Sequence, residues 1–97
     1  MKVFWLVSLM LMFDLISFLK AKDFTKVNKW TKQNTDNDPN RIFGRIYDSM
    51  NQYLKTSTIP EVIVILAKYQ YQAAFVANPE LNLLACLVEI MVTAEFQ

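Results

Sequence analysis

The sequence contains no histidine, one cysteine and one glycine among its 97 residues. Without histidine, the chain can form neither a histidine-based catalytic triad nor an imidazole metal site. Its single cysteine, Cys86, excludes an internal disulfide and a zinc cluster built from cysteines. Its single glycine, Gly44, excludes a glycine-rich loop that binds phosphates. These absences remove many of the common classes of enzyme and cofactor-binding protein.

Charge and hydropathy narrow the classes that remain. Ten basic and nine acidic side chains leave a net charge of +1, which does not suggest a general nucleic-acid-binding protein. Hydrophobic residues make up 54% of the chain, which is too many for a largely disordered one. Cys86 stands in an apolar stretch and is interpreted as a packed residue rather than a reactive thiol. We therefore predict a protein that is not an enzyme, with no cofactor, no metal ion and no small-molecule substrate.

Residues 3–19 form the longest apolar run, interrupted only by two serines and Asp14. As a helix, this run and the two residues after it would be about 28 Å long. The hydrocarbon core of a bilayer is roughly 30 Å thick, so we predict a transmembrane anchor over residues 1–22. A carboxylate is costly among lipid tails. Asp14 is therefore either a polar residue tolerated near the end of a tilted helix or facing a soluble partner, or a contact to a polar group of a partner subunit within the membrane.

Two other interpretations of this run stay open. A cleaved secretory signal peptide would leave a small secreted helical protein that acts in binding or signalling. Lys2 suits the positive start of a signal peptide, but Leu19 is not the small residue that cleavage after Ala21 requires. The third interpretation is a buried helix of a soluble protein or large assembly. Five lysines follow the run and oppose translocation, so we expect the C-terminal part on the cytoplasmic or matrix side.

Residues 23–38 are predicted to be a basic interfacial connector followed by a polar loop. Between residues 20 and 32, apolar side chains recur at helical spacing and lysines occupy the other side. This arrangement is typical of a membrane interface, where aromatic rings lie at headgroup depth and lysines reach phosphates. Binding of single-stranded nucleic acid is the weaker alternative, because the segment has no arginine. The predicted membrane-interface residues are Trp5, Lys20, Lys22, Phe24 and Trp30.

Residues 39–97 are predicted to form a helical domain. Its first helix follows Pro39 and has a continuous apolar face, which we expect to contact partner subunits. Gly44 interrupts this helix and suggests close packing or a kink. The predicted partner contacts are Asp14, Ile42, Phe43, Ile46, Tyr47 and Met50.

Two further helices are expected to pair as a hairpin at the C-terminal end. The first begins with a capping box formed by Thr58 and Glu61. The second begins in a similar way at Asn78 and Pro79. Residues 62–66 are rich in β-branched types, which leaves a buried strand open as an alternative to helix there.

These features together predict an all-α protein with one N-terminal transmembrane helix, followed by a small three-helix piece that ends in a helical hairpin. The function we expect is that of a non-catalytic, single-pass accessory subunit of a larger membrane complex. It would act by packing against other subunits and would contact the lipid bilayer, and an energy-transducing (respiratory) membrane such as the mitochondrial inner membrane fits such a subunit. The alternative is the secreted helical protein.

Overall fold

The computed structural model describes residues 2–34 and 39–97, with side chains from Met12 onward. Within these ranges the chain is mainly helical, and its only β-structure is an isolated bridge between Leu54 and Phe96. The all-α prediction is therefore confirmed, and residues 62–66 are helix rather than strand. In chain order, the elements are α1 (Lys2–Ala21), α2 (Phe24–Gln33), α3 (Pro39–Tyr53), the 3-10 turn η1 (Thr56–Thr58), α4 (Ile59–Ala73) and α5 (Pro79–Thr93).

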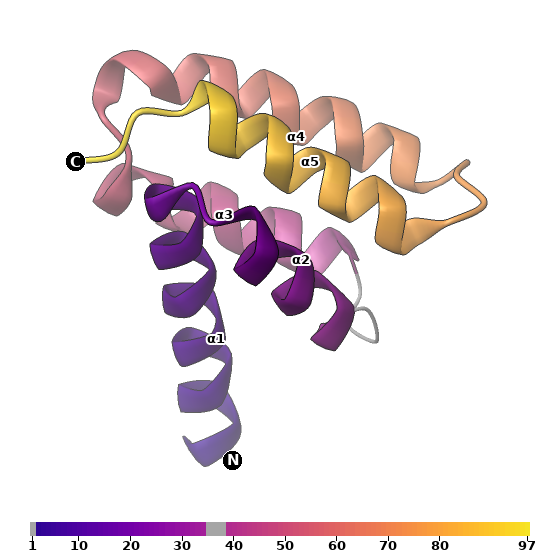
Figure 1. Ribbon diagram of the computed structural model, residues 1–97, viewed down its shortest axis with the longest axis horizontal. Helices are drawn as coiled ribbons and strands as arrows, with labels where there is room; N and C mark the ends of the chain where they lie inside the picture. Colours follow the sequence, from indigo (N-terminus) through magenta and orange to yellow (C-terminus); the bar gives the residue numbers. More distant parts are fainter. Residues whose placement is uncertain (1, 35–38) are drawn as a thin grey trace.

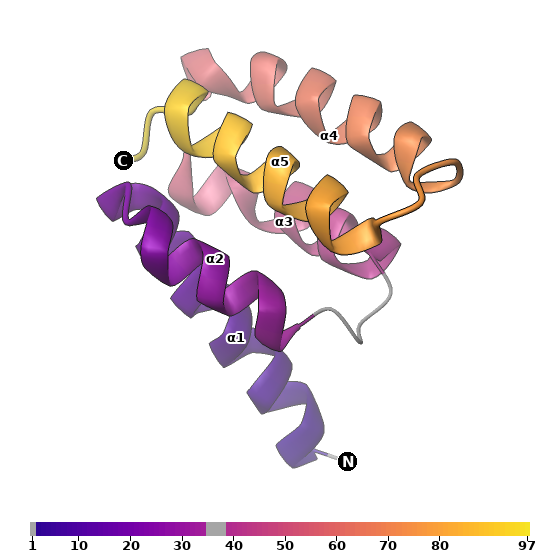
Figure 2. The ribbon, with the colours of Figure 1, turned by 45° about the vertical axis from the view of Figure 1, so that its right-hand side comes forward.

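Helix α5 lies in the middle of the arrangement (Figure 1). It packs against α4 on one side and against α2 and the end of α1 on the other, as Figure 2 shows from a second direction. Helices α4 and α5 run antiparallel, so the predicted C-terminal hairpin is confirmed. The first turns of α1 extend beyond the other helices, and this end of the chain points away from the rest of the molecule (Figure 1).

Polar side chains begin two of the helices. Asp23 before α2 and Asn78 before α5 each accept a hydrogen bond from the backbone N–H three residues later, at 3.2 Å and 3.1 Å. These bonds satisfy N–H groups that have no partner within the helix. Pro79 then occupies the first helical position of α5, where a missing N–H has no cost. The start predicted at Asn78 is therefore confirmed.

The capping box predicted at Thr58 is wrong. The chain enters α4 through η1, and Thr58 already has helical backbone angles (φ −96°, ψ −12°), so its hydroxyl is not placed to cap the helix. That hydroxyl instead accepts a hydrogen bond from the backbone N–H of Glu95, at 3.4 Å. Thr58 thus links the start of α4 to the end of the chain rather than closing its own helix.

A sharp corner at Lys22 separates α1 from α2. Lys22 has a φ of 56°, in the left-handed region that commonly ends a helix. Its N–H and that of Asp23 donate to the carbonyls of Leu19 and Phe18, both at 3.1 Å. This corner directs α2 back along α1, so the two helices pack against each other.

One cluster of buried side chains draws on all five α-helices. Helix α1 contributes its second half, and α2 contributes Val27 and Trp30. Helix α5 supplies six buried residues, one of which is the amide side chain of Asn82, bonded to the Tyr69 carbonyl at 3.2 Å. Residues 12–30 and residues 39–97 therefore share a hydrophobic core.

The predicted transmembrane helix over residues 1–22 is not supported. Among the described residues, no helix is both long enough and apolar enough to cross a bilayer. Leu15 and Leu19 are fully buried in the chain's own core, and Met12 and Ile16 are nearly so. A long apolar run suits a core helix as well as a lipid-exposed one, and here α2, α3 and α5 pack against it.

Candidate functional site

The described part of the chain offers little that could support catalysis. No three of its cysteine, aspartate and glutamate side chains come together as a metal site would need. Cys86 is fully buried, and burial raises the pKa of its thiol to about 12, so the reactive thiolate does not form at neutral pH. This places Cys86 in the core, as its apolar sequence context predicted.

A small polar cluster links α4 to α5 at the surface. The Lys68 ammonium lies 2.9 Å and 3.0 Å from the two carboxylate oxygens of Glu89. The pKa of Tyr69 is raised to about 12, mainly by its hydrogen bond with Glu89 and to a smaller extent by burial. Hydrogen bonds from Tyr69 and Lys68 lower the pKa of the Glu89 carboxyl. Since each charge in the pair has its partner, we interpret this cluster as a structural tie between two helices.

The residues predicted to contact partner subunits divide into two groups. Tyr47 and Asp14 are exposed. The other four face the interior of this chain, where they pack among the neighbouring helices and are not available to a partner. They are Ile42, Phe43, Ile46 and Met50. The apolar face of α3 was thus correctly located, but it is covered by the chain itself.

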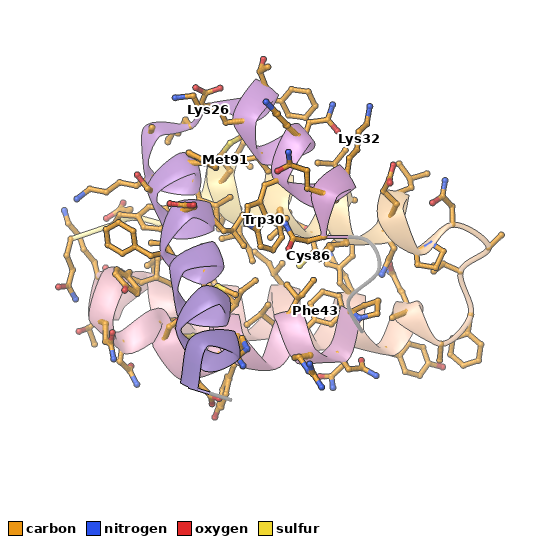
Figure 3. All side chains as sticks on the ribbon, turned by 90° about the horizontal axis from the view of Figure 1, so that it is seen from below. Lys26, Trp30, Lys32, Phe43, Cys86 and Met91 are labelled. Carbon is orange, nitrogen blue, oxygen red and sulfur yellow. The ribbon has the colours of Figure 1, made fainter. Side chains whose placement is uncertain are left out.

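The predicted membrane-interface residues also divide. Lys20, Lys22 and Phe24 are exposed. Trp30 is only 5% exposed and points into the body of the molecule (Figure 3), so it lies in the core rather than at headgroup depth. It lies there because Val27, one helical turn earlier, faces the same buried side of α2. Trp5 lies outside the described side chains.

Lysines dominate the solvent side of α2. Lys26, Lys29 and Lys32 follow one another at intervals of three residues, opposite the buried Val27, Trp30 and Thr31. Figure 3 shows Lys26 and Lys32 pointing away from the body. Two more exposed lysines lie at the corner between α1 and α2. We call this surface the lysine face, and it consists of Lys20, Lys22, Lys26, Lys29 and Lys32.

The solvent side of α4 has the opposite character. Val64 and Tyr71 on α4 are 67% and 71% exposed, and Phe75, in the turn directly after the helix, is 72% exposed. Ala67 lies between Val64 and Tyr71 along the helix and is also exposed. The rings of Tyr71 and Phe75 contact each other, with centroids 5.2 Å apart. We call these four residues the α4 face. Large exposed apolar side chains in a row mark an interaction surface more often than isolated ones do.

A shallow groove of about 270 Å³ adjoins the α4 face, between α3 and α4. An added Cβ at Gly44 would meet nothing within 4 Å, so the close packing suggested for this glycine is wrong. Gly44 instead leaves one wall of the groove without a side chain. Sequence reasoning missed the groove, although a glycine inside an amphipathic helix is a signal for it. The lining residues are Phe43, Gly44, Tyr47, Ile63, Leu66, Ala67 and Gln70.

Comparison with known proteins adds no assignment. No family model matches the chain, and no curated protein matches it. The function must therefore be inferred from the surfaces themselves.

Proposed function

We propose that this chain is a non-catalytic helical accessory subunit of a larger membrane-associated complex, and that it packs against a neighbouring subunit through the α4 face. The exposure of Val64, Tyr71 and Phe75 carries the proposal. In water, each of these side chains loses the stabilisation that burial gives, about 25 cal/mol per Å² of apolar surface. A second subunit that covers them would recover it.

The composition of the α4 face suits a protein neighbour. The centres of protein interfaces are depleted in charge and enriched in aromatic residues. Lys68 lies between Val64 and Tyr71 on the same side of α4, and its charge is already paired with Glu89 on α5. The adjoining groove, with Tyr47 on its rim, gives the surface a concave part into which a side chain of the neighbour can pack.

Association with a membrane is the second part of the proposal, and it rests on the sequence of the first helix. A single-pass crossing would require Leu15 and Leu19 to leave the core. Residues 2–11 would still extend about 15 Å as a helix, roughly half the thickness of the hydrocarbon core. We therefore propose that the chain associates with one side of the bilayer and does not cross it.

The secreted alternative is weaker in this fold. Cleavage after Ala21 would remove Met12, Leu15, Ile16 and Leu19, four members of the core. The side of α2 that contacts α1 would then be exposed to solvent. Retention of the first helix is therefore part of the proposal.

Assembly in the native host tests the proposed subunit role. The double variant Val64→Lys/Tyr71→Lys places two charges on the α4 face, and Asn51→Lys/Gln52→Lys makes the same change of charge at exposed positions of α3. In native gel electrophoresis of mild detergent extracts, the wild type and the α3 variant should migrate in one assembly larger than the chain. The α4 variant should migrate alone while keeping the wild-type melting temperature. A wild-type chain that migrates alone, or an α4 variant that stays in the assembly, would contradict the proposal.

A further inference from the structure

The lysine face concentrates positive charge on one side of the molecule. Residues 20–33 contain five lysines and a single acidic residue, Asp23, so this segment has a net charge of +4. All five lysines are exposed. Residues 56–97, by contrast, contain one lysine and four glutamates. The charge of the chain is therefore nearly balanced overall but divided along its length.

Asp23, the one acidic side chain within residues 20–33, contacts the lysine face only weakly. The Asp23 carboxylate accepts the backbone N–H of Lys26, and its other oxygen lies 4.0 Å from the Lys26 ammonium, a distance at which an exposed pair is weak. Lys26 also lies over the ring of Phe18, 5.6 Å from its centroid. Both contacts are made by the Lys26 ammonium itself, and the Lys26 side chain remains 62% exposed.

An exposed aromatic ring lies next to the corner that carries Lys20 and Lys22. Phe24 begins α2 and is 48% exposed, close to Lys20 and Lys22 along the chain. At a membrane surface, a ring in this position enters the headgroup layer while lysines beside it reach the phosphates.

We infer that the lysine face binds the anionic phospholipid headgroups of a membrane, with α2 lying along the surface. This inference deepens the proposed membrane association and rests on it. A row of lysines that points outward from one helix matches a planar layer of negative charge, and each lysine near such a surface contributes separately to binding. Single-stranded nucleic acid would instead require a series of exposed aromatic rings for base stacking, and residues 20–33 expose only Phe24.

Binding of the full chain to lipid vesicles tests the inference. One set of vesicles is neutral phosphatidylcholine, and the other contains about one third phosphatidylserine. The measured quantity is the ratio of binding to anionic over neutral vesicles, because apolar contacts of the chain with lipid contribute to both. The wild-type ratio should be large at about 0.1 M salt and should fall steeply toward 0.5 M, as screening requires. A ratio near one, or one insensitive to salt, overturns the inference without any variant.

A matched pair of variants locates the effect. Lys26→Gln/Lys29→Gln/Lys32→Gln removes three charges from the lysine face, and Arg41→Gln/Arg45→Gln/Lys55→Gln removes three from elsewhere. On the scale of membrane-surface lysines, the first should lower the ratio on the order of a hundredfold. The second should change the ratio by no more than about threefold relative to the wild type, because charges away from the membrane surface contribute little to binding. Equal losses in both variants would show a response to net charge alone and overturn the inference.

Two further outcomes separate the inference from other accounts. If the lysine substitutions abolish binding to a single-stranded oligonucleotide but not to anionic vesicles, the face binds nucleic acid and the inference is wrong. If they lower the vesicle ratio while the variant still migrates in the native assembly, the lysine face and the α4 face act independently. The variant Val64→Lys/Tyr71→Lys should give the converse result: it should leave the assembly while its vesicle ratio stays unchanged.

Discussion

Helices α2 and α4 both pack one side against α5, but they present opposite chemistry to solvent. The outer side of α2 carries Lys26, Lys29 and Lys32, whereas the outer side of α4 carries Val64 and Tyr71. The buried sides are similar, since both consist mainly of large apolar residues. Folding explains the buried sides of both helices. The outer sides must be explained by what the chain binds. We propose that α2 binds lipid headgroups and that α4 binds another subunit.

The largest expected effect distinguishes the two sides of α2. Trp30→Ala removes a side chain that is 5% exposed, and should lower the free energy of unfolding by about 3–5 kcal/mol. Lys29→Ala, on the solvent side, should change it by no more than about 0.5 kcal/mol. Urea denaturation followed by circular dichroism measures both values. A Trp30→Ala variant as stable as Lys29→Ala would mean that Trp30 is not in the core.

The second effect makes the same distinction on α4, where both sides are apolar. Leu66→Ala, at a residue 5% exposed, should cost about 2–5 kcal/mol of unfolding free energy. Val64→Ala, at a residue 67% exposed, should stay within about 0.5 kcal/mol of the wild type. The isolated chain is the right material for this denaturation experiment, because a bound subunit would add its own stabilisation. Similar costs at the two positions would show that the α4 face is covered within the chain.

A smaller effect, of the opposite sign, is expected at the groove beside the α4 face. Gly44→Ala should raise the free energy of unfolding by about 0.5–1 kcal/mol, because alanine restricts the unfolded chain and the added methyl meets no neighbour. Thermal unfolding of the two proteins in parallel measures the difference. A destabilised Gly44→Ala variant would show that a neighbouring group closes over this position.

The smallest effect concerns the tie between α4 and α5. Glu89→Gln should cost about 0.2–1 kcal/mol at pH 7, the range of exposed ion pairs. The pKa of the Glu89 carboxyl is lowered in the folded chain, so its contribution is complete above the ordinary glutamate pKa and is lost as the pH falls through the lowered value. Stability measured from pH 7 to pH 2 should therefore show the two proteins converging in acid. A gap that persists at pH 2 would assign the cost to packing rather than to charge.

Local sequence features predicted the helices well. The Asn78 cap and the proline after it placed the start of α5, and the amphipathic pattern placed the inner side of α3 at Ile42, Phe43 and Ile46. These signals act within one helical turn, so they do not depend on the rest of the fold. Thr58 is the exception, because its hydroxyl accepts a hydrogen bond from the backbone N–H of Glu95, which is distant in sequence.

Sequence reasoning failed where an apolar surface has more than one suitable environment. Leu15 and Leu19 suit lipid tails as well as a protein core, and the corner at Lys22 that folds α2 back on α1 carries no glycine to mark it. The inner side of α2 was found, but its Trp30 was assigned to a membrane interface because periodicity does not say what an apolar side contacts. The α4 face was only implied, by a helix with apolar residues on nearly all sides.

Photo-crosslinking in native membranes tests most directly whether the two outer sides meet different surroundings. A photoreactive phenylalanine analogue would replace Tyr71 on the α4 face in one variant and Lys29 on the lysine face in another, both at exposed positions. Mass spectrometry of the adducts should find a distinct polypeptide attached at position 71 and phospholipid attached at position 29. Lipid at both positions, or the same polypeptide at both, would contradict the account.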